Sequence, residues 1–285
     1  MKDPRYTQLA EQVVNYSVRV QPGEHVNLRM QDIPDAMIVE LIRAVRRAGG
    51  VPHVDISHAA VSKELALGAT DEQYELVGRY RLQRAEDMQV HICFYADHNS
   101  FENADVPGER MQIISRHLKP ASDVTCNRRK WTILAWPTPS MAQAAGMSTE
   151  EFEDFYFRCC LADYASMKTA MLHLKGLMEA TDRVRITGPG TDLSFSIKGI
   201  PAIPCCGDCN VPDGEVYTAP IKDSVKAPSP TMPPAYTTAF LSMACASVSR
   251  TEKLWRLTAT AMKKLCSRFL IPMPAHATSA SLLWA

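Results

Sequence analysis

The chain has 285 residues, of which 46% are hydrophobic and 22% charged, as is typical of soluble globular proteins. Acidic and basic residues balance at 31 each, so bulk charge gives no reason to expect a nucleic-acid partner or an acidic membrane surface. No run approaches the roughly 18 apolar residues of a membrane span, and the chain begins with a polar Met-Lys-Asp-Pro rather than a signal peptide. Nine cysteines, with adjacent pairs at 159–160 and 205–206, do not resemble a disulfide framework in a chain of this length. We therefore expect a cytoplasmic protein that binds neither nucleic acid nor membrane.

The chain opens with an expected β-α-β unit. Residues 25–30 have the pattern of a short strand, and residues 34–48 place apolar side chains at helical spacing. Gly49 and Gly50 are a helix stop signal, and residues 51–56 then have the pattern of a second strand. Successive strands joined by a helix are typical of parallel pairing.

The alternation continues through the first half of the chain. Residues 89–95 and 130–136 are apolar and β-prone, and a helix is expected between them near residues 109–118. A parallel sheet with helices on its faces is built from strands of this kind. The pattern predicts an α/β fold with a mostly parallel N-terminal sheet and flanking helices.

Two capping boxes mark the starts of long helices. Thr70 with Gln73 and Ser148 with Glu151 have the spacing at which a side-chain oxygen accepts from the third backbone N–H of a helix. The second pair is expected to begin a helical region that extends to about Glu179.

The pattern changes to β after the second long helix. Residues 183–187 and 192–197 are predicted strands, and Gly188-Pro189-Gly190 between them is expected to be a hairpin turn instead of a phosphate-binding loop. We expect an N-terminal α/β domain over residues 1–181 and a β-rich domain that begins at residues 182–225.

The segment over residues 210–220 places a carboxylate directly after a rigid turn. Pro212 fixes its own φ, and Gly214 can adopt a positive φ, so the Pro-Asp-Gly turn feeds a short β-prone run over residues 216–218. Glu215 stands at the head of this run, where a metal ligand would be held still. An ordinary turn with a solvated glutamate is the alternative that spacing alone allows.

The same segment is similar to the metal-site motif of the aminopeptidase T/aminopeptidase S family of metallo-exopeptidases. Further blocks that resemble this family follow in family order, and together they extend over most of residues 1–225. They are Leu9–Ser17, Pro137–Gln143, Met147–Tyr156, Gly188–Leu193 and Ile197–Ala202.

The resemblance implies an enzyme that releases N-terminal residues from peptides through metal-activated water. It implies two divalent ions per site, which could be zinc, cobalt, magnesium or manganese, and it implies a homodimer. Glu215 is the family metal ligand that this sequence carries, and no catalytic or cofactor-binding residue is assigned beyond it. The β-rich segment would be the incomplete start of the metal-binding domain.

The composition changes again at residue 226. Residues 226–285 contain no glycine, although the chain has 13, and they hold one acid, Glu252, against seven Lys and Arg. A natural basic tail rich in Ala, Ser and Thr is one explanation. No strand or helix pattern in this segment is matched by turn chemistry, so we expect a disordered tail and not a packed domain.

The genetic code favours a second explanation of this tail. If each codon from Arg268 onward is read from its third base, the sequence can spell Ile-Leu-Asp-Thr-Asp-Ala-Gly-Ala-Arg-Tyr-Ile-Gly-Glu-Phe-Ala-Leu-Gly. This resembles the family's next metal-site block, and the same shift over residues 227–236 allows Thr-Ile-Thr-Tyr-Asn-Ala-Pro-Ser-Val. We infer that the reading frame slips near Val225, which leaves the family protein truncated. The chain as given would then lack most metal ligands, bind no metal and be inactive.

Two further patterns suggest ligand sites less strongly. Cys206 and Cys209 have the spacing of a zinc knuckle, but no suitably spaced second pair accompanies them. His53 and Asp55 share one face of a predicted strand, where a polar strand end explains them better than a metal site.

The alternative to the enzyme is a non-catalytic α/β module that binds a nucleotide or a peptide.

Overall fold

The computed structural model describes residues 3–188 and 191–226. Apart from Lys226, the tail expected over residues 226–285 lies outside the described residues. The chain divides into two compact units. Unit 1 contains residues 1–170 and 205–214, and unit 2 contains residues 171–204 and 215–285.

Unit 1 is built on a four-stranded parallel sheet in the order β2-β1-β3-β4. The strands are β1 (His25–Gln31), β2 (Val51–Ser57), β3 (Val90–Ala96) and β4 (Lys130–Trp136). This sheet confirms the predicted α/β fold.

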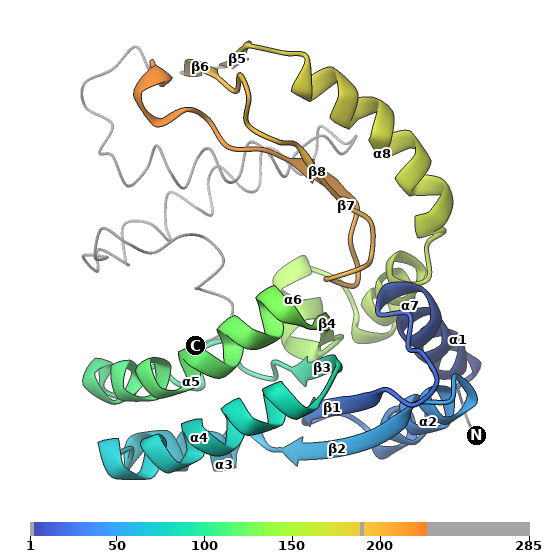
Figure 1. Cartoon of the computed structure of the whole chain (residues 1–285), viewed down its shortest axis with the longest axis vertical. Helices are drawn as coiled ribbons and strands as arrows, with labels where there is room; N and C mark the ends of the chain where they lie inside the picture. Colours follow the sequence, from blue (N-terminus) through green and yellow to red (C-terminus); the bar gives the residue numbers. More distant parts are fainter. Residues whose placement is uncertain (1–2, 189–190, 227–285) are drawn as a thin grey trace. The chain divides into compact units, whose positions relative to one another are not determined.

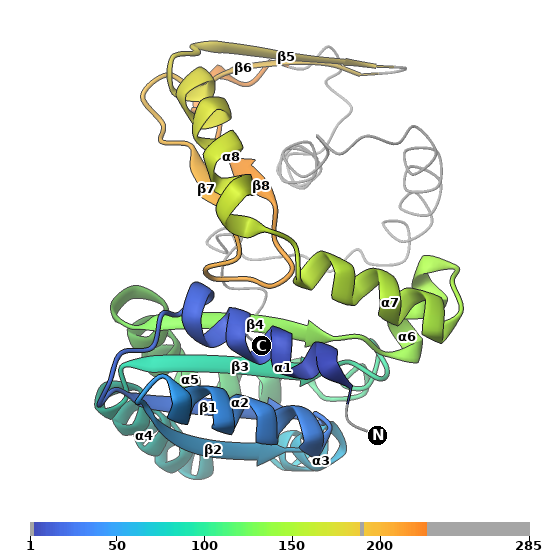
Figure 2. The ribbon, with the colours of Figure 1, turned by 90° about the vertical axis from the view of Figure 1, so that its right-hand side faces the viewer.

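Helices cover both faces of the sheet. Figures 1 and 2 show α1 and α2 on one face and α3, α4 and α5 on the other. The helices of the described chain are α1 (Pro4–Gln12), α2 (Asp35–Arg47), α3 (Ala59–Leu67), α4 (Asp71–Asp87), α5 (Gly108–Arg128), α6 (Pro139–Ala145), α7 (Thr149–Cys160) and α8 (Tyr164–Glu179), with a short π-helical stretch η1 (Val13–Ser17) after α1. None of these helices is long and apolar enough in the described chain to cross a lipid bilayer.

The two faces of the sheet differ in chemistry because side chains alternate along a strand. Leu28 and Met30 of β1 and Ile92 and Phe94 of β3 are buried in the main core together with residues of α1 and α2. The alternate positions of the same strands carry polar side chains, including buried Asn27. The core therefore lies mainly on the α1 and α2 side, and a polar layer lies on the other.

The capping boxes form as predicted. The Thr70 hydroxyl accepts from the N–H of Gln73 at 3.2 Å, and the Ser148 hydroxyl accepts from the N–H of Glu151 at 3.2 Å. The helical region after Ser148 is divided in two, because the Asp163 carboxylate accepts from the N–H of Ser166 and caps a new helix, α8.

Unit 2 is β-rich in its described part. Strands β5 (Arg183–Gly188) and β6 (Thr191–Ser196) form an antiparallel hairpin, and β7 (Ile203–Cys205) pairs with β8 (Glu215–Tyr217). A short 3-10 turn, η2 (Lys222–Ser224), follows. Leu193, Phe195 and Ile197 form a small core in this unit.

Residues 205–214 return to unit 1 because they pair with the free edge of β4. The N–H of Ile133 donates to the Cys209 carbonyl at 2.9 Å, and the N–H of Val211 donates to the Ile133 carbonyl at 3.0 Å. The compact units therefore cut across the segments 1–181 and 182–225 that the sequence pattern suggests.

Candidate functional site

The loop over residues 205–214 is held in unit 1 by two tyrosines. The Tyr16 hydroxyl donates to the Cys206 carbonyl at 3.0 Å, and the Tyr164 hydroxyl accepts from the N–H of Asp213 at 3.1 Å. The two phenol rings stack with centroids 6.2 Å apart. Burial raises the pKa of Tyr16 to about 12 and also raises that of Tyr164, so both hydroxyls keep their protons.

Asp213 closes the loop on itself. One carboxylate oxygen accepts from the N–H of Gly207 at 3.0 Å, and the other accepts from the N–H of Gly214 at 2.9 Å. Gly207 has a φ of 79° and Gly214 a φ of 147°, conformations that disfavour residues with a Cβ atom. The expected positive φ at Gly214 is therefore confirmed.

Glu215 follows this loop as the first residue of β8. Its side chain is exposed, and the next residue, Val216, is buried. The strand expected after the Pro-Asp-Gly turn is present. The alternation of a short strand places Glu215 and Tyr217 together on the exposed face.

The described residues do not fit a two-metal centre. Within residues 3–188 and 191–226, no group of three or more His, Cys, Asp or Glu side chains is arranged to hold a metal ion. Such a centre needs several ligands that converge from different elements, whereas Glu215 supplies one carboxylate. No reaction step can be assigned to the described residues on this basis.

Cys206 and Cys209, which have zinc-knuckle spacing, are not part of a group of three or more metal-ligating side chains among the described residues. Cys206 is buried and Cys209 is exposed, and both are free thiols. Partial desolvation of its sulfur, together with the negative charges of Asp208 and Asp213, raises the pKa of Cys209 to about 11. A thiol that keeps its proton near neutral pH is a poor nucleophile.

His53 and Asp55 of strand β2, the other candidate ligand pair, make contacts with other residues. Nε2 of His53 lies 2.8 Å from Nδ1 of His25, and the two imidazole rings stack. Asp55 pairs instead with Arg84 of α4, with 3.6 Å between Oδ2 and Nη1. His53 and Asp55 therefore face different partners.

The Gly188-Pro189-Gly190 segment joins an antiparallel hairpin. Gly188 of β5 pairs with Thr191 of β6, which leaves a two-residue connection. Residues 189 and 190 themselves lie outside the described residues.

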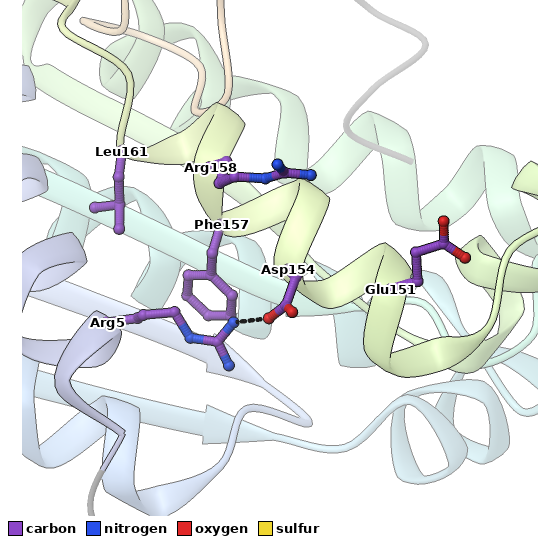
Figure 3. Close-up of a pocket in the computed structure, with 6 residues that line it drawn as sticks. All are labelled: Arg5, Glu151, Asp154, Phe157, Arg158 and Leu161. Atoms are coloured by element: carbon purple, nitrogen blue, oxygen red, sulfur yellow. Dashed lines mark hydrogen bonds and ion pairs between the residues drawn. The ribbon is translucent and has the colours of Figure 1, made fainter.

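A pocket of about 530 Å³ lies between α1 and α7 in unit 1 (Figure 3). Its lining residues are Arg5, Glu151, Asp154, Phe157, Arg158 and Leu161. The Arg5 guanidinium stands 4.6 Å from the Phe157 ring centroid and donates to Asp154 at 2.6 Å, and it also donates to Asp3 and Glu153. Because the Arg5 guanidinium is already bound by three carboxylates, we assign this pocket no ligand.

Sequence reasoning missed a His-Asp contact at the carboxyl edge of the sheet. Asp32, just after β1, lies 2.9 Å from Nδ1 of His58, and its second oxygen accepts from the N–H of Ala59 at 2.8 Å. Burial acts to raise the pKa of Asp32, but these two hydrogen bonds and the positive charges of His58 and His98 together outweigh it and lower the pKa. The signal in the sequence is weak, because Asp32 and His58 are 26 residues apart and only the parallel β1–β2 pair brings them together.

Comparison with solved structures places this fold beside known proteins. AmpT from Thermus thermophilus matches with a TM-score of 0.64 and 19% identity, over 78% of this chain and 63% of its own. The 2,5-dihydroxypyridine dioxygenase from Pseudomonas putida KT2440 matches with a TM-score of 0.45 and 13% identity, over 78% of this chain and 57% of its own. The chain thus spans less than two thirds of the length of either protein. Comparison with curated protein sequences gave no match.

The profile of one protein family matches most of the sequence. Residues 2–237 match the family described as thermophilic metalloprotease (M29). This range contains the whole of unit 1 from residue 2 onward, the loop over residues 205–214 and Glu215. The chain therefore belongs to the thermophilic metalloprotease (M29) family.

Proposed function

We propose that this sequence derives from a metal-dependent aminopeptidase, a hydrolase that releases N-terminal residues from peptides. The observation that carries the proposal is the family match over residues 2–237. The four-stranded parallel sheet and the AmpT-like fold support it. Two divalent ions, when bound, would supply an activated water and polarise the scissile carbonyl.

We propose Glu215 as the metal ligand that this chain retains. Its place at the head of β8, exposed and directly after a loop closed by hydrogen bonds, supports this role. The identity of the ions stays open among zinc, cobalt, magnesium and manganese. A homodimer and a cytoplasmic location are part of the same proposal.

We further propose that the chain as given is inactive. The shifted-frame spelling after Val225 implies that the remaining ligands are encoded in another frame. Convergence of several ligands supplies the affinity of a metal site, so a single carboxylate should not retain an ion. This part of the proposal rests on the sequence of residues 227–285.

The test compares two proteins from one gene. One is the chain as given, and the other carries a one-nucleotide correction near codon 225. Each is loaded with Zn²⁺, Co²⁺ or Mn²⁺, and bound metal and hydrolysis of leucyl and other aminoacyl reporter substrates are measured. We expect stoichiometric metal and turnover from the corrected protein alone. Absence of turnover from the corrected protein would overturn the aminopeptidase assignment, and turnover by the uncorrected chain would overturn its inactivity.

A non-catalytic α/β binding module is the second candidate. A parallel sheet such as that of unit 1 offers a ligand crevice at the carboxyl ends of its strands. The same comparison decides between the two, because a binding module would gain no hydrolysis when the frame is corrected.

A further inference from the structure

The sheet face under α4 carries charge at its centre. The parallel register places Arg29 of β1 beside Asp55 of β2 on one side and beside Cys93 of β3 on the other. Two positions earlier, Nδ2 of Asn27 lies 3.3 Å from Nδ1 of His91, so these alternate positions share one face. Arg29 therefore lies in a polar row on the face opposite the main core.

Helix α4 adds two more guanidinium groups to this row. Arg84 contacts Asp55 at 3.6 Å, which places α4 over this face of the sheet. Arg81 is partly buried and precedes Arg84 by three residues on α4, so it lies on the same side of this helix. The charges of Arg29 and Asp55 act on it there. Burial, followed by the positive charge of Arg29, lowers the pKa of Arg81 to about 10.

The neighbouring groups do not balance this charge. Asp55 is the carboxylate that acts on Arg81, and Arg84 shares it. Burial raises the pKa of the Cys93 thiol and lowers that of His91 to about 4, so both are neutral near pH 7. The described cluster therefore places three arginines against one carboxylate, with Arg29 and Arg81 sharing the excess positive charge.

Like charges that are partly removed from water raise the free energy of a fold unless a counter-charge compensates them. A guanidinium group presents a planar fork of N–H donors that matches the two oxygens of a carboxylate or phosphate. Two such groups side by side are suited to one small oxyanion.

The cluster lies next to the point where the strand order of the sheet reverses. From β1 the chain goes to β2 on one side of the sheet and then to β3 on the other side of β1. In open parallel sheets, ligands bind outside the carboxyl ends of the strands at this kind of reversal. Arg29 is two residues before Gln31, the last residue of β1.

We propose that Arg29 and Arg81 form a binding site for a small oxyanion, a phosphate or carboxylate group, between strand β1 and helix α4. The site lies within unit 1 and does not depend on the proposed peptidase activity. Unit 1 would thus bind a small oxyanion through its own residues.

The test uses the full chain and inorganic anions. Thermal unfolding is followed in chloride, then with phosphate or acetate added at millimolar concentration and constant ionic strength, and binding is measured by calorimetry. We expect a saturable rise in Tm and one site per chain. The more strongly bound of the two anions identifies the ligand group as phosphate or carboxylate, and equal binding identifies a general oxyanion site.

Variants assign the response to the two arginines. Arg81→Gln and Arg29→Gln should each weaken anion binding by about tenfold or more, since each removes a charged hydrogen-bonding partner. Arg79→Gln is the matched control, because Arg79 is exposed on the same helix and should leave binding unchanged. If Arg81→Gln does not fold, Arg29→Gln decides alone. The proposal fails if the unaltered chain shows no saturable response, or if the folded variants keep the full response.

Discussion

The Tyr164 hydroxyl lies between two backbone groups, accepting from the N–H of Asp213 at 3.1 Å and donating to the Cys159 carbonyl at 2.8 Å. The side chain is fully buried, so neither backbone group readily exchanges this partner for water. One phenol oxygen thereby joins the start of α8, the end of α7 and the loop that precedes Glu215.

Tyr164→Phe should destabilise the protein by about 1–3 kcal/mol, because it leaves the N–H of Asp213 and the carbonyl of Cys159 without this partner while the ring packing stays. Urea unfolding, with the midpoint and the m-value both recorded, measures the change. Tyr80→Phe is the control, since Tyr80 is 65% exposed on α4. Equal midpoints for the two variants would show that the Tyr164 hydroxyl does not stabilise the loop.

Gly207→Ala should destabilise the protein more than Gly146→Ala. Both glycines have a positive φ, 79° and 70°, so both substitutions carry a similar backbone cost of about 1 kcal/mol. A Cβ at Gly207 would stand 2.7 Å from the Tyr164 ring, whereas a Cβ at Gly146 meets no atom within 4 Å. We expect the difference between the two variants to be about 1–3 kcal/mol of unfolding free energy, from overpacking. A difference near zero in chemical denaturation would contradict this close contact.

Stability should fall as the pH drops from about 7.5 to about 5, and buried His91 should contribute to the loss. Burial lowers its folded-state pKa from 6.5 to about 4, and the positive charges of Arg129 and Arg84 act in the same direction. The unfolded chain therefore binds a proton at this residue below about pH 6.5, while the folded chain binds it only near pH 4. The stability that neutral His91 contributes is fully present above pH 6.5 and is lost progressively toward pH 4. By pH 5 the loss is about 2 kcal/mol.

His91→Gln should remove that part of the pH dependence. The unfolding free energy of each protein is measured at both pH values, and the change between the two pH values is compared between proteins. A loss of stability that is the same at both pH values does not affect this change. His98→Gln, at an exposed position after β3, is the control and should keep the slope of the unaltered chain. An unchanged slope in His91→Gln would mean that this imidazole titrates alike in the folded and unfolded states.

In the frame-corrected protein, Glu215→Gln should lower kcat/KM for aminoacyl substrates by about 100-fold or more, since loss of a direct metal ligand should exceed the 10–100-fold cost of losing an outer partner. Metal content should fall together with activity. Glu72→Gln, an exposed glutamate in the first turn of α4, is the control for loss of one carboxylate. Full metal content and turnover in Glu215→Gln would place the ligand elsewhere.

The sequence by itself determined the strands of unit 1 and much of their helical cover. Strand patterns located β1 and β4 to within about a residue, because a strand that packs one face in a core places an apolar side chain at every second position. Thr70 and Ser148 located two helix starts, because capping is a contact within three residues. The separated blocks in family order identified the family independently of the structure. Helix α1 was missed, although Asp3 caps it and Pro4 is its first residue.

The tertiary structure alone decided which distant residues meet. Residues 205–214 join the edge of β4 through hydrogen bonds with Ile133, a contact between segments more than 70 residues apart that no local period encodes. Arg29 and Arg81 lie 52 residues apart in the sequence and become neighbours because α4 crosses back over the sheet. Local patterns report the burial and periodicity of one element. The charge of a cluster depends on the packing of several elements, and it therefore appears only in the folded chain.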